Sequence, residues 1–213
     1  VSRKSKVKVS KFKKQRRVGV ELPGLGKAGA LAKRNYPPGH TGQNRRRPTE
    51  YALRLTEKQK VLFHYNIREK QFRRFVKLAK KGKVLNWTDQ LFSLLEMRLD
   101  NLVFRLGFAS SIPAARQMVV HRHVLVDGKV LDCPSAIVSV GQEITLKDKI
   151  YKLVCYQSTK QEPTLALPTF LEKAEAKDKD IGKLIEQPTL SDVPFQLEFL
   201  FISELYANRF PIL

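Results

Sequence analysis

Residues 98–149 read RLDNLVFRLGFASSIPAARQMVVHRHVLVDGKVLDCPSAIVSVGQEITLKDK, and this stretch decides the fold. Apolar residues recur at helical spacing over 99–106 and stop at a glycine. Ser110 or Ser111 can then cap a second helix, with Pro113 in its first turn where a missing N–H does no harm. The first half of the stretch therefore predicts two consecutive helices. The second of these helices has an apolar side, expected at Ile112, Ala115, Met118 and Val119.

The second half of the stretch predicts strands. Asp127-Gly128 joins two apolar runs, which is a strong hairpin signal, and Asp127 is expected to form this turn rather than to act as an acid. Further strands are predicted over 137–140 and 143–146. The whole unit is expected to be two helices packed on a small antiparallel sheet, which makes the chain an α+β protein.

Upstream, the sequence predicts three more helices. Thr49 can cap a helix that runs to about residue 63, and a second helix is expected over 68–81, ended by Gly82. Thr88 is expected to cap a third helix, whose buried stripe is Leu91, Leu94 and Leu95. Phe72 and Phe75 share one apolar face of the second helix, so we expect them to pack in the core rather than to stack on bases.

The charge of the chain points to a polyanion as its partner. Forty Lys and Arg stand against 20 Asp and Glu, a formal charge of +20, and the whole excess lies in residues 1–83. Residues 1–47 carry much of it without apolar periodicity and with repeated Pro and Gly, so we expect a basic arm that becomes ordered only on RNA. The alternative is a solubilising tail.

Other classes of site are not indicated. Cys133 and Cys155 have no neighbouring thiol and are expected to be small buried residues, and the four His do not complete a zinc spacing, so no metal is expected. No apolar run is long enough for a membrane helix, and no secretory signal is visible. An enzyme is not expected either, because LPGLGKAG lacks the strand that precedes a phosphate loop and no nucleophile has an assignable base.

Two segments carry a resemblance to a known family. MRLDNLVFRLGFASSIPAARQMVVHRHVLVDGKVLDCPS resembles the RNA-binding domain of the small-subunit ribosomal protein S four family, and YPPGHTGQNRRRPTEYALRLTEKQK resembles the segment upstream of it in that family. The resemblance covers residues 36–149 and 204–209. The first segment also occurs in pseudouridine synthases, tyrosyl-tRNA synthetases and ribosome-rescue proteins, whereas the second is far more specific.

The resemblance implies a structural protein of the small ribosomal subunit that folds and stabilises a multi-helix junction of ribosomal RNA. It also implies neighbouring small-subunit proteins, and a place near the path by which messenger RNA enters. Alternatives are a free RNA chaperone, a ribosome-rescue factor or a regulator of translation. Many relatives hold zinc with four cysteines in the arm, whereas this arm has none and so resembles chloroplast and cyanobacterial members. This resemblance implies that the protein works in the chloroplast stroma, with the bacterial cytoplasm as the alternative.

The resemblance also implies a division of the chain. We expect a basic arm over 1–47, a helical domain over 48–97 completed by 195–213, an RNA-binding module over 98–157 and a variable linker over 158–194. The last segment would return to the helical domain through Phe195, Leu197, Phe199, Phe201 and Ile202.

The expected RNA contacts come from two sources. Residues that match the family's motif are Tyr51, Arg54, Arg98, Arg116, Gln117, His121 and His123. The basic character of the chain adds Arg16, Arg17, Arg45, Arg46, Arg47, Lys58, Arg73, Arg105, Arg122 and Lys129. For His121 and His123, a role in fixing the turn is as well supported as an RNA contact. Asp100 is expected to orient a neighbouring Arg.

Overall fold

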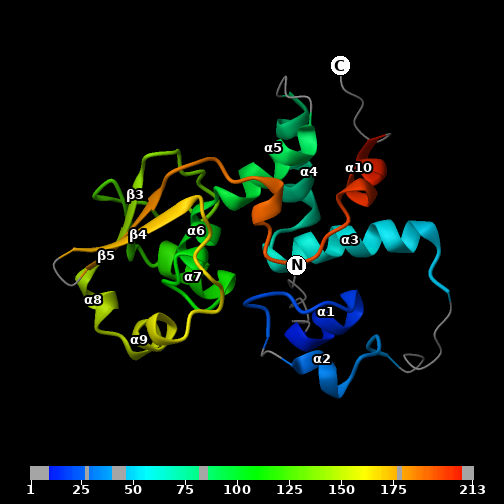
Figure 1. Cartoon of the computed structure of the whole chain (residues 1–213), viewed down its shortest axis with the longest axis horizontal. Coiled ribbons are helices and arrows are strands. Elements are labelled where there is room, and N and C mark those ends of the chain that lie inside the picture. Colours follow the sequence, from blue (N-terminus) through cyan, green and yellow to red (C-terminus); the bar gives the residue numbers. More distant parts are fainter. Residues whose placement is uncertain (1–9, 27–28, 40–46, 82–85, 177–178, 208–213) are drawn as a thin grey trace, which may run out of the picture.

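The structure is a computed structural model that describes residues 10–26, 29–39, 47–81, 86–176 and 179–207. It has a helical part and a mixed α+β part, which lie side by side (Figure 1). One core of buried apolar residues runs through both parts, so they pack as a continuous body. We call the α+β part the module.

Four helices make the helical part. They are α3 (Glu50–His64), α4 (Glu69–Lys81), α5 (Trp87–Glu96) and α10 (Phe199–Ala207). The predicted cap at Thr49 is confirmed, because its side chain accepts a hydrogen bond from the backbone N–H of Ala52 at 3.3 Å. The cap at Thr88 is wrong, since α5 already begins at Trp87 after Asn86. Gly82 lies outside the described residues.

The C-terminal helix α10 completes the helical part from the far end of the sequence. Ile202 and Tyr206 are fully buried, and the Tyr206 ring meets the Phe72 ring edge-on at 5.6 Å between centroids. The Tyr206 hydroxyl also donates to Glu69 at 3.0 Å. This helix therefore covers apolar surface that α3 and α4 cannot cover alone, as the resemblance implied.

The module is built on one antiparallel sheet with the strand order β2-β1-β3-β5-β4. Its strands are β1 (Val124–Val126), β2 (Lys129–Val130), β3 (Glu143–Leu146), β4 (Leu171–Ala176) and β5 (Lys179–Leu184). Its helices are α6 (Leu99–Arg105), α7 (Ile112–Val120), α8 (Asp148–Tyr151) and α9 (Val154–Gln161). Ser111 caps α7, as predicted, by accepting from the N–H of Ala114.

The hairpin predicted at Asp127-Gly128 is confirmed. Both residues have positive φ, 49° and 75°, the backbone of a tight turn between right-handed twisted strands. The Asp127 carboxylate accepts from the N–H of Glu143 at 2.9 Å and from Gln142 Nε2 at 2.7 Å, and these two hydrogen bonds lower the pKa of Asp127. Asp127 is therefore a turn former, and it also ties the hairpin to β3.

The strand predicted over 137–140 was wrong. The segment 137–140 forms no strand: Ile137 makes a single bridge to Arg98, and Val138 donates to the carbonyl of Met97 at 3.0 Å. This segment therefore pairs with the connection between α5 and α6 instead of the sheet. The segment expected as a variable linker, 158–194, contains the second half of α9, both β4 and β5, and the 3-10 helix η1 (Leu190–Asp192).

Gly182 explains how the added hairpin β4–β5 fits against the helices. A Cβ built on this residue would overlap the side chain of Leu106, so β5 lies too close to the end of α6 to carry any side chain there. Its neighbour β3 pairs with it through Ile144 and Gly182. The module therefore reaches to residue 184.

The basic arm is partly folded, which corrects the expectation that it becomes ordered only on RNA. It contains α1 (Lys11–Val18) and α2 (Ala30–Lys33). Val18, Leu22 and Leu25 are buried together, with Phe63 and Phe195 packed against them. These few apolar residues show no period because the rest of their small core comes from α3 and the C-terminal segment.

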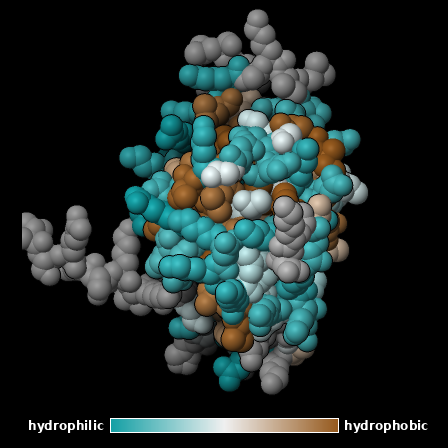
Figure 2. Space-filling model, turned by 90° about the vertical axis from the view of Figure 1, so that its left-hand side faces the viewer, coloured by the Kyte–Doolittle hydropathy of each residue, from teal (hydrophilic) through white to brown (hydrophobic). Residues whose placement is uncertain are grey.

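The surface of the module mixes polar and apolar side chains. On the face in Figure 2, hydrophobic residues form separate patches among hydrophilic ones. Cys133 and Cys155 are both exposed, so the expectation that they are buried was wrong: Cys133 lies in the loop after β2, and Cys155 lies in the first turn of α9. Across the described ranges, no helix is long and apolar enough to cross a membrane.

Candidate RNA interface

A buried ion cluster connects α6 to α7. Arg98 is 1% exposed and donates two hydrogen bonds to Asp100, from Nε at 3.0 Å and from Nη2 at 2.7 Å. Arg116 Nη2 donates to the same carboxylate at 2.6 Å. The prediction that Asp100 orients a neighbouring Arg is therefore confirmed. The Asp100 carboxylate pairs with the guanidinium groups of both Arg98 and Arg116, so the cluster has a net positive charge. Arg116 is the partly exposed member of the cluster.

A second buried cluster surrounds Glu96, which is fully buried. Its carboxylate accepts from Asn101 Nδ2 at 2.7 Å, from Arg105 Nε at 3.1 Å and from the hydroxyl of Tyr65. Arg105 also donates to the carbonyl of Asp192 in η1. Burial and the Glu96 charge raise the pKa of Tyr65 well above its ordinary value. This cluster fastens α3, α5, α6 and the C-terminal segment together.

Arg98 and Arg105 thus belong to the interior rather than to an RNA-facing surface. Both were expected to contact RNA, Arg98 from the resemblance and Arg105 from the basic character of the chain, because basic side chains in an RNA-binding module usually face outward. Asp100 binds Arg98 bidentately, although the buried Nη1 of Arg98 has no hydrogen-bond partner, and Arg105 is shared between Glu96 and the carbonyl of Asp192. The proposed interface therefore excludes Arg98 and Arg105.

Three predicted cations on α3 and α4 are paired with carboxylates. Arg54 binds Glu204 of α10 at 2.6 Å, and Lys58 binds Glu69 at 3.1 Å with only 8% of its surface exposed. Arg73 binds Glu69 at 3.0 Å. Burial raises the pKa of Glu69, but hydrogen bonds from Arg73 and Lys58 outweigh it and leave the pKa lowered. These cations therefore hold the helical part together, and Arg73 remains half-exposed.

A basic pocket lies where the arm, the corner between α3 and α4, and the module meet. It has a volume of about 660 Å³. Its lining residues are Lys14, Leu62, Phe63, Asn66, Ile67, Arg68, Lys70, Gln71 and Arg116. Arg116 is 30% exposed by side chain and donates from Nη1 to the carbonyl of Asn66 at 3.1 Å. Four cations from three separate elements thus converge on one hollow, which suits a phosphate group.

The other predicted residues of the module gather around the end of α7. Gln117, His121 and Arg122 are exposed, and the ring centroids of His121 and His123 lie 6.1 Å apart. Arg122 has a left-handed backbone, with φ 61°, and pairs with Asp132 at 3.3 Å. Burial, followed by the charges of neighbouring groups, lowers the pKa of His123. Lys129, in the adjoining hairpin, is exposed.

The predicted residues of the arm are partly accounted for. Arg16 stacks on the Tyr36 ring at 4.5 Å and donates from Nε to the carbonyl of Tyr36 at 2.9 Å, so it fixes the arm's own loop. Arg17 and Arg47 are exposed. Arg45 and Arg46 lie outside the described residues. Tyr51 is 58% exposed on the first turn of α3, where a base or sugar can reach its ring.

The sequence prediction missed Lys14, Arg68 and Lys70 as members of one site. Lys14 lies in α1, Arg68 directly before α4 and Lys70 in its first turn. The turn at Asn66, whose φ is 49°, brings Arg68 and Lys70 to the pocket. Asn tolerates this left-handed backbone better than most residues. A polar Asn between two predicted helices is a signal for such a corner. That Lys14, Arg68 and Lys70 lie near Arg116 depends on tertiary packing, which no local signal reports.

The chemistry available at this surface is that of cationic and neutral donors. Within the described ranges, no group of three or more His, Cys, Asp or Glu could hold a metal ion. Exposed guanidinium, ammonium and amide groups bind phosphate and base edges.

Two family models match the chain and together cover most of it. Residues 6–96 match the Ribosomal protein S4/S9 N-terminal domain, and residues 97–144 match the S4 domain. A small ribosomal subunit protein uS4B of Bdellovibrio bacteriovorus is 53% identical over 202 residues, which is 95% of this chain and 97% of that protein. The uS4 proteins of Methylobacillus flagellatus and of Nostoc sp. PCC 7120 are 42% and 44% identical and span 93% and 91% of this chain, and 96% and 94% of their own.

Proposed function

The chain belongs to the uS4 family of small-subunit ribosomal proteins, and from that premise we propose that its basic pocket holds a phosphate of a multi-helix ribosomal RNA junction. Membership makes the chain an RNA-binding structural protein of the small ribosomal subunit, not an enzyme. The match to the N-terminal domain separates it from proteins that share the S4 domain alone.

The observation that carries the proposal is the convergence of Lys14, Arg68, Lys70 and Arg116. These four side chains belong to the arm, to the helical part and to the module, so a phosphate bound among them contacts all three at once. RNA binding would then lock the relative positions of the parts. Reciprocally, binding stabilises the conformation of the RNA junction that places a phosphate in the pocket over conformations that place no phosphate there.

A second contact region supports the same proposal. Gln117, His121, Arg122 and His123 at the end of α7, with Lys129 in the hairpin, present donors on the module alone. Arg17, Arg47 and Tyr51 extend the surface along the arm and α3. We propose that the basic pocket supplies electrostatic attraction and that the α7 end reads the shape of a groove.

The place of the chain in the cell is proposed from its relatives. The relatives named above are bacterial, one of them cyanobacterial, and they do not support the chloroplast expected from the arm. We therefore propose ribosomes of the bacterial cytoplasm as its location. Contacts with neighbouring small-subunit proteins and with entering messenger RNA remain part of the proposal.

The test is the salt dependence of RNA binding. The triple variant Lys14→Ala, Arg68→Ala, Lys70→Ala is compared with Lys152→Ala, Lys179→Ala, Lys183→Ala, which removes the same charge from exposed positions of β5 and the end of α8. The probe is a small-subunit ribosomal RNA fragment with its multi-helix junction, titrated at several KCl concentrations. We expect the slope of log K against log salt to flatten by about two to three in the first triple variant and little in the second. Equal slopes would refute the basic pocket.

A further inference from the structure

Two segments that contribute to the helical part contain no Lys or Arg. They are residues 86–97 and 184–207, in a protein with 40 Lys and Arg among 213 residues. Both segments are fully described, and they pack together, because α5 contacts η1 and the Phe92 ring meets the Phe199 ring at 5.1 Å. The fold thus brings these two cation-free segments together in one sector of the helical part.

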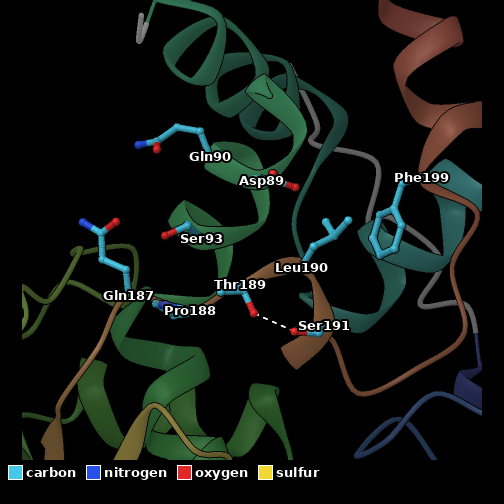
Figure 3. Close-up of a pocket in the computed structure, with 9 residues that line it drawn as sticks. All are labelled: Asp89, Gln90, Ser93, Gln187, Pro188, Thr189, Leu190, Ser191 and Phe199. Carbon is cyan, nitrogen blue, oxygen red and sulfur yellow. Dashed lines mark hydrogen bonds between the residues drawn. The ribbon is translucent and has the colours of Figure 1, made fainter. Parts of the chain in front are cut away.

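A hollow of about 620 Å³ lies within this sector, between α5 and the segment that leads into η1. We call it the α5 hollow. Its lining residues are Asp89, Gln90, Ser93, Gln187, Pro188, Thr189, Leu190, Ser191 and Phe199. Figure 3 shows Gln90 and Gln187 toward one end and Leu190 with Phe199 toward the other. Among these residues, Asp89 is the one that carries a charge.

The floor of the α5 hollow is held by its own hydrogen bonds. The Asp192 carboxylate accepts from the N–H of Thr189 at 2.7 Å and from its hydroxyl at 2.8 Å, which closes a capping box around η1. The hydroxyls of Thr189 and Ser191 lie 2.7 Å apart. Arg105 donates to the carbonyl of Asp192 from the core side. The hollow is therefore preformed, which lowers the entropic cost of binding.

The chemistry of the α5 hollow disfavours a phosphate and favours a basic protein segment. A phosphate would meet the Asp89 carboxylate without a cation among the lining residues, whereas an ammonium or guanidinium group would find that carboxylate and the amide and hydroxyl oxygens beside it. Leu190 and Phe199 can cover the aliphatic stem of the same Lys or Arg. We propose that the α5 hollow docks a Lys- or Arg-bearing segment of a neighbouring protein in the small subunit. This inference rests on the proposed function, since the neighbour is a component of that subunit.

The experiment uses a photo-crosslinker in assembled subunits. p-Benzoylphenylalanine replaces Gln187, which is exposed at the hollow, or Gln157, which is equally classed as exposed but lies on α9. Small subunits containing each variant are purified, irradiated and analysed by mass spectrometry. We expect position 187 to link to one protein segment with Lys or Arg within a few residues of the linked site, and position 157 not to link to it. A link to RNA, or no link from incorporated protein, would overturn the inference.

Charge variants complete the test. Asp89→Lys reverses the charge in the hollow, Asp89→Asn removes it with little change of shape, and Glu162→Lys makes the same reversal at an exposed site on the module. We expect the crosslink yield from position 187 to fall about tenfold with Asp89→Lys, to fall severalfold with Asp89→Asn and to stay unchanged with Glu162→Lys. Equal yields in all three would overturn the inference. Failure of the parent chain to enter subunits would instead count against the proposed function.

Discussion

Arg116 Nη1 donates a hydrogen bond of 3.1 Å to the carbonyl of Asn66, and this bond joins the module to the corner between α3 and α4. The same guanidinium is anchored on the other side by Asp100 at 2.6 Å. Two hydrogen-bond partners, the Asn66 carbonyl and the Asp100 carboxylate, therefore hold the Arg116 guanidinium at the edge of the basic pocket. We expect the contribution of Arg116 to RNA binding to depend on both partners.

Arg116→Ala is expected to weaken RNA binding more than it weakens the fold. Asp100 keeps its two hydrogen bonds from Arg98, so no carboxylate is left buried and unpaired, and we expect a loss of about 1–2 kcal/mol in the free energy of unfolding. Arg116→Lys keeps the charge but loses the fork, and should fall between parent and Ala variant in affinity. Filter binding and thermal melting check this. Loss of a cooperative melting transition in Arg116→Ala would show that the residue is structural.

Gly24→Ala should detach the arm from the module. Gly24 has φ 71°, and an added Cβ would lie 2.8 Å from Cζ of Phe104. Gly19 has the same φ but nothing within 4 Å of an added Cβ, so Gly19→Ala isolates the backbone strain of about 1–2 kcal/mol. We expect faster hydrogen exchange over residues 18–25 in Gly24→Ala than in Gly19→Ala. Identical exchange in the two variants would mean that the close approach to Phe104 does not matter.

Gly182→Ala tests whether the hairpin β4–β5 belongs to the module. We expect a destabilisation of about 1–3 kcal/mol from overpacking against Leu106. Leu106→Ala alone should cost about 2–5 kcal/mol by opening a cavity, but the two changes together should cost less than their sum. Urea unfolding of the two single variants and the double variant measures this coupling. Additive costs would contradict the contact between β5 and α6.

The buried His64 predicts a loss of stability in mild acid. Burial, followed by the positive charge of Arg105, lowers the pKa of His64 from 6.5 to about 3. The unfolded chain therefore takes up a proton below pH 6.5 that the folded chain refuses, so the stability present above pH 6.5 is lost as the pH falls toward 3. At pH 5 this amounts to about 2 kcal/mol.

The control for His64 is a variant that cannot titrate. His64→Phe fits among the Tyr65, Phe104 and Phe195 rings that surround the imidazole, and should flatten the difference in unfolding free energy between pH 7.5 and pH 5 by about 2 kcal/mol. An unchanged pH profile in His64→Phe would contradict the assignment.

Local signals predicted the elements that depend on local chemistry. The Thr49 and Ser111 caps, the helix over 69–81 and the Asp127-Gly128 turn each involve residues within a few positions of one another. The strands of the hairpin β4–β5 have no such signal. LEKAEA is poor in β-branched and aromatic residues, and it forms a strand because β5 offers it a partner.

The site was harder to predict than the fold, for the same reason. Arg98 and Arg116 look alike in sequence, yet Asp100 buries one and leaves the other at the surface. Nothing within a few positions of Lys14 indicates that it lies beside Arg68. Side-chain exposure depends on which elements meet, and that is decided by packing between residues far apart in the chain.

The return of α10 onto α3 and α4 sets an order for folding during synthesis. The module closes once residue 184 has emerged, whereas the apolar face around Phe72 stays uncovered until Tyr206 is made. A nascent chain therefore carries a folded module beside an incompletely covered helical part, and it depends on α10 to become resistant to aggregation and proteolysis. Loss of α10 would be expected to affect the quality control of this protein in the cell before it affected the shape of the module.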